Sequence, residues 1–259
     1  MFAEVISIGD ELTSGQRLDT NSQWLSQQLG DLGVRVLYHT TVGDDLAANV
    51  DVFRNAVRRA DLIVVTGGLG PTEDDLTRQA LADTFGVELR LDEPSLEHIQ
   101  NLFRQRRNRD MPPANRIQAM FPAGANVIPN RHGTAPGIDM RQSRPDRGDV
   151  RIFALPGVPA EMREMWHETV APAIETLLGR TRRVIRRRVI HCFGAGESDV
   201  ERMLPNLIAR GRVPQVGITA SQATISLRIT AEAETEAACD ALIEPTAATI
   251  YEQIGRAHV

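Results

Sequence analysis

The sequence predicts an α/β fold: a largely parallel sheet with helices on both faces, followed by a small α+β unit. Short runs of branched apolar residues alternate with amphipathic segments from residue 3 to residue 178, as in βαβ units. Several of these runs end in glycine and acidic residues, which is typical of the carboxyl edge of a parallel sheet. Beyond residue 180 the spacing of the segments becomes that of a compact two-layer unit.

The first unit is expected to span residues 1–179. Apolar runs predict its strands, apolar periodicity predicts its helices, and Gly179 closes the last helix. The polar segment 141–149 is expected to form the tip of a hairpin. The expected strands are 3–8, 34–42, 61–66, 125–129, 135–140 and 151–155, and the expected helices are 21–32, 47–59, 76–85, 93–107 and 160–178.

The second unit is expected to span residues 180–253. At about 70 residues it is near the lower limit for an independent core. Residues 254–259 match the translation of a common sequencing adapter. We therefore expect a non-native tail there and a native protein that continues past Gln253. The expected strands of this unit are 181–192, 214–220 and 223–231, and the expected helices are 197–208 and 234–253.

The composition favours a soluble, cytoplasmic protein. Its 42% hydrophobic and 24% charged residues are ordinary for a globular chain, and no apolar stretch approaches the roughly 20 residues of a membrane span. Two cysteines are too few for a disulfide framework. A net charge of −5 makes nucleic acid an unlikely partner. All 29 basic residues are arginines, which excludes Schiff-base catalysis and the lysine of a Walker loop; GC-rich coding explains this bias.

The most informative segment is 62–77, which reads LIVVTGGLGPTEDDLT. It combines a buried strand, a glycine turn, and a helix start that is rich in acids. Such a junction aims backbone N–H groups at one point, which suits a phosphate. Because the neighbouring acids would repel a bare phosphate, a divalent cation between them is expected. A plain turn is the alternative interpretation.

Acidic residues follow two further predicted strands. Asp10 and Glu11 come after the first strand, and Asp44 comes after the second. If the strands are parallel, these acids and Asp75 converge at one sheet edge. Carboxylates that share a cleft favour a hard cation and shift one another's pKa values. Taken singly, each of these aspartates could equally cap a helix or shape a turn.

Other segments are more ambiguous. Residues 133–137 (GTAPG) form either a rigid loop facing the site or a strand entry. The turn at 155–161 (LPGVPAE) leads from a strand into a helix. The six histidines show no zinc spacing. The arginine-rich segment 180–188 is interpreted as a charged outer face of a sheet, with nucleic-acid binding as the alternative.

In their order along the chain, these motifs resemble the competence/damage-inducible protein A (CinA) family. The similarity covers residues 3–178 and continues through the glycine turn at 194–198 and the strand at 228–230. The segments that carry it are IGDEL at 8–12 with Asn21, VGD at 42–44, TGGLGPTEDDLT at 66–77, NR and QA at 115–119, Asn130, GTAPG at 133–137 and LPGVPAEM at 155–162.

The resemblance implies an N-terminal domain of the molybdopterin-binding type with ADP-ribose pyrophosphatase activity, followed by a KH-like unit. It also implies a divalent metal (Mg²⁺, Mn²⁺ or Co²⁺), with K⁺ as a further candidate ion, and a homo-oligomer. Many members carry a C-terminal nicotinamide mononucleotide amidohydrolase domain that has no counterpart here. Asp44 and Asp75 occupy the places of functional aspartates in molybdopterin proteins, whereas Asp74 replaces an arginine of some relatives.

These inferences lead to one set of candidate residues. The catalytic candidates are Asp75, Asp44, Asp74 and Glu11, and the metal candidates are Asp10, Asp44 and Asp75. Which acid binds metal and which activates water stays open. The candidates for phosphate or nucleotide binding are Thr66, Gly67, Gly68, Gly70, Pro71, Thr72, Asn21, Gly133, Thr134 and Gly157.

Three functions compete for this chain. The first hypothesis is metal-dependent hydrolysis of ADP-ribose to AMP and ribose 5-phosphate, in pyridine-nucleotide recycling. The second is a molybdopterin-like or nucleotide-binding module that regulates an attached amidohydrolase. The third is an interaction protein for DNA uptake or repair, which the family's name and the arginine-rich strand suggest.

Overall fold

The computed structural model describes residues 1–179, 183–221 and 224–255. The chain divides into two compact units near Leu178. Among the described residues, no helix has the length and apolar character that crossing a membrane would require.

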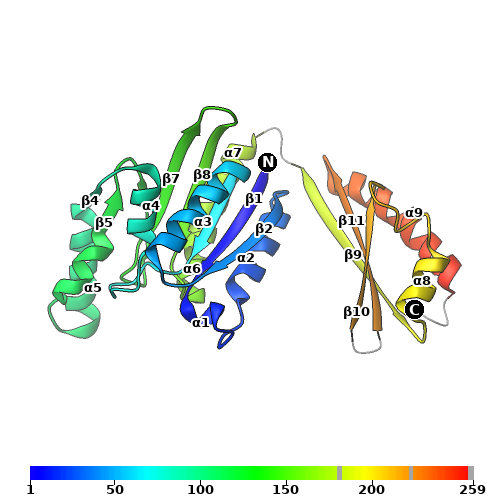
Figure 1. Ribbon diagram of the computed structural model, residues 1–259, viewed down its shortest axis with the longest axis horizontal. Coiled ribbons are helices and arrows are strands. Elements are labelled where there is room, and N and C mark those ends of the chain that lie inside the picture. Colours follow the sequence, from blue (N-terminus) through cyan, green and yellow to red (C-terminus); the bar gives the residue numbers. More distant parts are fainter. Residues whose placement is uncertain (180–182, 222–223, 256–259) are drawn as a thin grey trace. The chain divides into compact units, whose positions relative to one another are not determined.

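The first unit is built on a six-stranded sheet with the strand order β2-β1-β3-β8-β7-β6 (Figure 1). Strands β2, β1, β3 and β8 run parallel, whereas β7 and β6 are antiparallel to their neighbours. The predicted largely parallel sheet is therefore confirmed. The strands are β1 Phe2–Ile8, β2 Arg35–Val42, β3 Leu62–Thr66, β6 Asn126–Ile128, β7 Gly137–Arg144 and β8 Gly148–Leu155.

Helices cover both faces of this sheet, as the alternating pattern predicts. One face packs against α3 and α4 in the main apolar core. On the other face, Ser22 of α2 hydrogen bonds to Ser7 of β1 at 2.6 Å, and Trp24 of α2 contacts Trp166 edge-on. The helices are α1 Asp10–Thr13, α2 Thr20–Asp31, α3 Leu46–Arg59, α4 Thr77–Phe85, α5 Glu93–Arg107, α6 Pro159–Met165 and α7 Ala171–Leu178.

The central strands carry apolar residues at successive positions, which explains why both faces of the sheet are buried. Val5 and Ile6 of β1 point to opposite faces, and both are fully buried. Continuous apolar burial of this kind is typical of parallel strands that lie between two helical layers. The buried residues of β3, Leu62–Thr66, follow the same rule, so the glycine loop begins from a rigid strand.

Three local features differ from the sequence-based expectations. The polar segment 141–149 is mostly strand: β7 and β8 pair as far as Arg144 and Gly148, and only the connection is a turn. Strands β4 (Leu89–Leu91) and β5 (Met120–Pro122) form a small separate ladder, which their short apolar runs did not signal. The helix expected at 160–178 contains a π-helical turn at Trp166–Val170, next to Pro172, which cannot donate a helical hydrogen bond.

The second unit has a three-stranded antiparallel sheet in the order β10-β11-β9, with its own apolar core. Helix α8 is shorter than predicted because Pro205 disfavours helical continuation at the residue before it. The expected strand at 181–192 begins outside the described residues. Residues 256–259 of the expected tail also lie outside them. The elements are β9 Val184–Phe193, α8 Glu197–Met203, β10 Gln215–Ser221, β11 Thr224–Ala233 and α9 Glu236–Ile254.

Acids on α9 pair with two of the arginines on β9. Arg186 lies 3.0 Å from Glu236, and Arg188 lies 2.8 Å from Glu244. This part of the arginine-rich segment is therefore a charged face partly neutralised by a helix; residues 180–182 of the segment lie outside the described residues.

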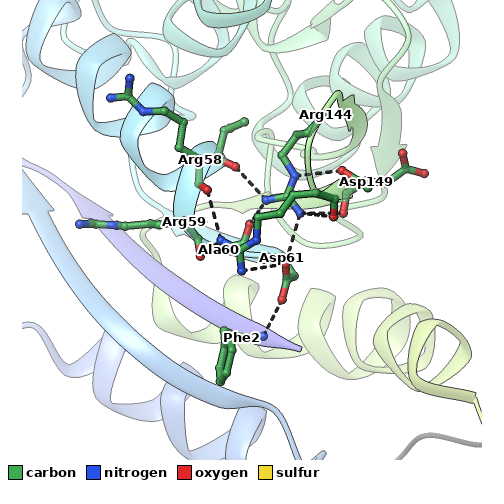
Figure 2. Close-up of polar contacts among 10 residues, drawn as sticks. Phe2, Arg58, Arg59, Ala60, Asp61, Arg144 and Asp149 are labelled. Carbon is green, nitrogen blue, oxygen red and sulfur yellow. Dashed lines mark hydrogen bonds and ion pairs between the residues drawn. The ribbon is translucent and has the colours of Figure 1, made fainter.

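The edge of the first sheet where its parallel strands begin is tied together by arginines from the β7–β8 hairpin (Figure 2). Arg144 donates to the carbonyl oxygens of Val57 and Ala60 at the end of α3, at 2.9 and 2.7 Å, and to Asp61 at 3.2 Å. Asp61 also accepts a hydrogen bond from the Phe2 amide at 3.0 Å. The hairpin thus caps a helix C-terminus that is distant in sequence.

Asp61 at this junction should make stability depend on pH. Partial burial disfavours its ionised form, but the Phe2 amide, the Arg144 hydrogen bond and the charges of Arg147 and Arg144 outweigh this effect. The pKa of Asp61 therefore lies below its usual value. Because the folded-state pKa is lowered, the stabilisation is present above the unfolded-state pKa of about 4 and is lost as pH falls through the folded-state value.

We predict that Asp61→Asn lowers the free energy of unfolding by about 1 kcal/mol at pH 7. Urea unfolding measured from pH 7 down to pH 3 should show the variant and the parent chain converging in acid. Asp51→Asn is the control, since Asp51 is exposed and lies 3.9 Å from Arg54. An equal loss at every pH would contradict the assigned role of the Asp61 charge.

Candidate functional site

A groove of about 540 Å³ lies at the carboxyl ends of β1, β3 and β8. Open α/β sheets bind their ligands at this edge. The groove collects loop backbone, acids and one exposed arginine. Its lining residues include Gly9, Glu11, Arg17, Asp44, Gly67, Gly68, Leu69, Gly70, Pro71, Asp74, Asp75, Gln118, Thr134, Gly157 and Glu161.

The carbonyl groups of the glycine loop are held from the side of α4. Thr77 donates its hydroxyl to the Gly67 carbonyl at 2.8 Å and its amide to the Gly68 carbonyl at 3.2 Å. Arg78 donates to the next two carbonyls, those of Leu69 at 2.9 Å and Gly70 at 3.4 Å. Four successive carbonyls are therefore bonded by the first two residues of α4.

This arrangement fixes the direction of the loop amides. In a trans peptide the C=O and the following N–H point in opposite directions. Because the Gly67 and Gly68 carbonyls face α4, the N–H groups of Gly68 and Leu69 point the other way. Neither amide has a hydrogen-bond partner among the described residues, so the loop offers two adjacent donors for an anion.

Asp75 is bonded to the backbone of the same loop. Its two carboxylate oxygens accept hydrogen bonds from the amides of Gly70, at 2.6 Å, and Thr72, at 2.9 Å. The Thr72 hydroxyl adds a third bond. Asp75 lines the groove as predicted, but its first structural effect is to hold the turn that follows the glycines.

Asp10 and Asp44 cap each other across two strand ends. The Asp10 amide donates to the Asp44 carboxylate at 2.9 Å, and the Asp44 amide donates to the Asp10 carboxylate at 3.0 Å. Burial, followed by the charges of Asp10, Asp74 and Glu11, raises the pKa of Asp44 despite the Asp10 amide. The groove therefore concentrates negative potential around Asp44, which a bound cation would relieve.

Most of the predicted residues meet in this groove, and five do not line it. Asp10 and Thr72 act through the neighbours described above, and Asn21 and Thr66 line a smaller adjoining pocket. Gly133 is packed behind the wall: its amide donates to Asn130 at 2.7 Å, and Asn130 in turn donates to Glu161 at 2.7 Å.

Asn21 connects the two pockets to the β8 turn. Its side-chain amide donates to the Gly157 carbonyl at 2.9 Å and to the Thr66 hydroxyl at 3.2 Å. Gly157 lies so close to Gly67 that an added Cβ would be 3.6 Å from the Gly67 Cα. The loops that follow β3 and β8 are thus fitted directly against each other.

The predicted metal ligands were Asp10, Asp44 and Asp75, and the geometry of the groove bears on whether each could serve. Among the described residues, no three His, Cys, Asp or Glu side chains are grouped as a preformed metal centre. Mg²⁺, however, keeps several waters and needs only one or two protein carboxylates together with substrate phosphates. Asp44 and Glu11 beside the loop amides fit that mode of binding, whereas Asp75 already accepts three hydrogen bonds.

Sequence reasoning missed Arg17 and Arg78. Arg17 is an exposed cation in a groove whose other charged residues are acids, and nothing in the sequence distinguishes it from other loop arginines. Arg78 did leave a signal, because it shares the apolar face of α4 with Leu81 and Ala82 at helical spacing. An arginine on such a face indicates a buried charge with specific partners.

Comparison with known proteins identifies the family to which the chain belongs. Residues 4–176 match the family model described as "Probable molybdopterin binding domain", and residues 187–258 match that described as "Damage-inducible protein CinA KH domain". The chain belongs to the CinA family. It is 40% identical over 255 residues to a "Putative competence-damage inducible protein" of Caldicellulosiruptor bescii, covering 98% of this chain and 60% of that protein.

Other CinA relatives agree. A "CinA-like protein" of Nostoc sp. is 40% identical over 261 residues, covering 98% of this chain and 58% of the relative. The crystal structure of CinA from Thermoplasma acidophilum superposes with a TM-score of 0.59 at 33% identity, covering 66% of this chain and 96% of that one. The present chain thus spans about 60% of the length of the curated relatives that it matches.

The glycine loop should not tolerate a side chain at Gly67. This residue has φ +106°, and a Cβ there would overlap the backbone carbonyl of Ile8. Gly86 also has a positive φ, +64°, but its Cβ would enter open space. We predict that Gly86→Ala costs about 1 kcal/mol of unfolding free energy, and that Gly67→Ala costs clearly more, as measured by urea unfolding. Equal losses would contradict the close packing of this loop.

Proposed function

We propose that this chain hydrolyses the diphosphate bond of ADP-ribose, giving AMP and ribose 5-phosphate for pyridine-nucleotide recycling. The observation that carries the proposal is that one groove is lined by two loop amides without a partner among the described residues and by several carboxylates. The N–H groups of Gly68 and Leu69 suit phosphate oxygens. The carboxylates of Glu11, Asp44 and Asp74 line the same groove and suit a cation that accompanies a diphosphate.

A divalent cation held by Asp44 with Glu11 or Asp74 would neutralise phosphate charge and polarise the attacking water. The chain's own groups perform the remaining tasks. Asp75 keeps the Gly70–Thr72 turn in place, and Asp10 orients the Asp44 carboxylate through its amide. A carboxylate in this cluster that does not contact the cation can accept the proton of the water.

The dimensions of the groove support a nucleotide as substrate. Its volume of about 540 Å³ falls in the usual range for small-molecule sites. Arg17 lines both the groove and the adjoining pocket that contains Asn21 and Thr66. We infer that the phosphates lie at the glycine loop and that the sugars extend along the groove itself.

A regulatory binding module is the second candidate. It is favoured by the length comparison, since the relatives extend well beyond the part that this chain matches. In that case the groove would bind a nucleotide or pterin phosphate without cleaving it, and the ligand would act on the rest of the full-length protein. Tight binding without turnover would distinguish this function from hydrolysis.

If the chain is a hydrolase, the purified protein should release AMP from ADP-ribose in the presence of Mg²⁺, Mn²⁺ or Co²⁺. Chromatography would measure the AMP. Asp44→Asn should lower kcat by about a hundredfold or more, because it removes a charge at the proposed centre. Asp75→Asn should also lose most activity, since it loosens the loop. Glu73→Gln is the control: Glu73 is exposed and does not line the groove.

Two results would contradict the proposal. One is full turnover by Asp44→Asn with unchanged metal dependence. The other is calorimetric binding of ADP-ribose with no AMP under any of the three metals, which would leave the binding module as the function of this groove.

A further inference from the structure

Arg78 is a charged side chain in an unusual position, directly beneath the glycine loop. It is only 1% exposed. Its terminal nitrogens donate to the carbonyls of Leu69 and Gly70. Its Nε is buried without a hydrogen-bond partner among the described residues. Burying a guanidinium that has no directly bonded carboxylate is costly, so such a residue needs a compensating role.

The electrostatics keep this guanidinium charged. Burial lowers the pKa of Arg78 to about 10, and the negative charge of Asp75 opposes that effect. At neutral pH the side chain is therefore protonated. It places a positive charge on the inner side of a loop whose outer side faces the acids of the groove.

We propose that Arg78 is a positioning residue for phosphate at the glycine loop: it holds the Leu69 and Gly70 carbonyl oxygens away from the groove, and its charge favours phosphate on the loop's outer side. The forked guanidinium bonds two successive carbonyls, which turns the Leu69 and Gly70 oxygens away from the ligand. If either of these carbonyls rotated outward, it would present an oxygen to the phosphate and repel it. This inference rests on the phosphate-binding part of the proposed function, but it does not depend on catalysis.

The shape of the side chain matters as well as its charge. Arginine offers a planar fork that can bond two acceptors at once, whereas lysine is a point charge on a flexible stem. Lysine at this position would keep a cation but could not hold both carbonyls in the same geometry. Methionine would fill similar space with neither charge nor donors.

Arg144 provides a matched control within the same unit. Its side chain is 8% exposed, and it donates to the carbonyls of Val57 and Ala60, as Arg78 does to those of the loop. It lies at the opposite edge of the sheet, where the parallel strands begin. Arg144→Met should therefore lower stability by a similar mechanism without changing the groove.

The test measures ADP binding by calorimetry in Mg²⁺, together with thermal unfolding, for the parent chain, Arg78→Met, Arg78→Lys and Arg144→Met. We expect Arg78→Met to weaken ADP binding about tenfold or more, Arg78→Lys to recover part of the affinity, and Arg144→Met to bind like the parent. Chemical shifts of the Gly68 and Leu69 amides should respond to ADP in the parent chain and respond far less in Arg78→Met.

Several results would overturn the inference. It fails if the parent chain does not bind ADP, if folded Arg78→Met or Arg78→Lys binds ADP as tightly as the parent, or if Arg144→Met loses equal affinity. If Arg78→Met does not fold, Arg78→Lys decides the question. ADP binding that depends on Arg78, combined with no hydrolysis of ADP-ribose, would support this role while rejecting the proposed hydrolase.

Discussion

The candidate site depends on one constraint: the carbonyls of the glycine loop must face α4. Thr77 and Arg78, the first two residues of that helix, bond the carbonyls of four successive loop residues. Since each peptide is planar, fixing the Gly67 and Gly68 carbonyls through Thr77 also fixes the amides of Gly68 and Leu69. The absence of side chains at Gly67 and Gly68 is what permits this path, because both have a positive φ and neither has room for a Cβ.

The rest of the groove is assembled against this loop. The β8 turn reaches it through the close contact of Gly157 with Gly67, and Asn21 ties that turn to α2. The reciprocal bonds of Asp10 and Asp44 bring the ends of β1 and β2 together beside it. At the other edge of the sheet, Arg144 and Asp61 join the starts of the strands to α3 (Figure 2). The glycine loop thus follows a strand of a sheet that is stabilised by hydrogen bonds at both edges.

Much of the fold and of the groove could be predicted from the sequence, and what could not be predicted has physical causes. Apolar runs that end in glycine and acids identify parallel strands and the edge where ligands bind, so Gly67, Asp44 and Asp75 could be placed together. Patterns report residue types but not hydrogen-bond partners, so capping could be named as an alternative role for Asp10 and Asp44, but their reciprocal bonds could not be derived. The hairpin tip expected at 141–149 is present, but its turn is limited to 145–147. The expected turn was too long because polar residues on a strand at the rim of a sheet look like those of a turn.

Arg78 shows how a single residue can reconcile the conflicting charges of this site. The carboxylates of the groove favour a cation and repel a diphosphate, whereas the loop amides favour a diphosphate and not a cation. A buried guanidinium behind the loop adds positive potential on the phosphate side without occupying space in the groove, and Asp75 lies near enough to moderate its cost. A site arranged in this way can hold phosphate and cation side by side, because each faces its own set of partners. Hydrolysis and regulated binding both require that arrangement, and they differ only in whether a water molecule is activated within it.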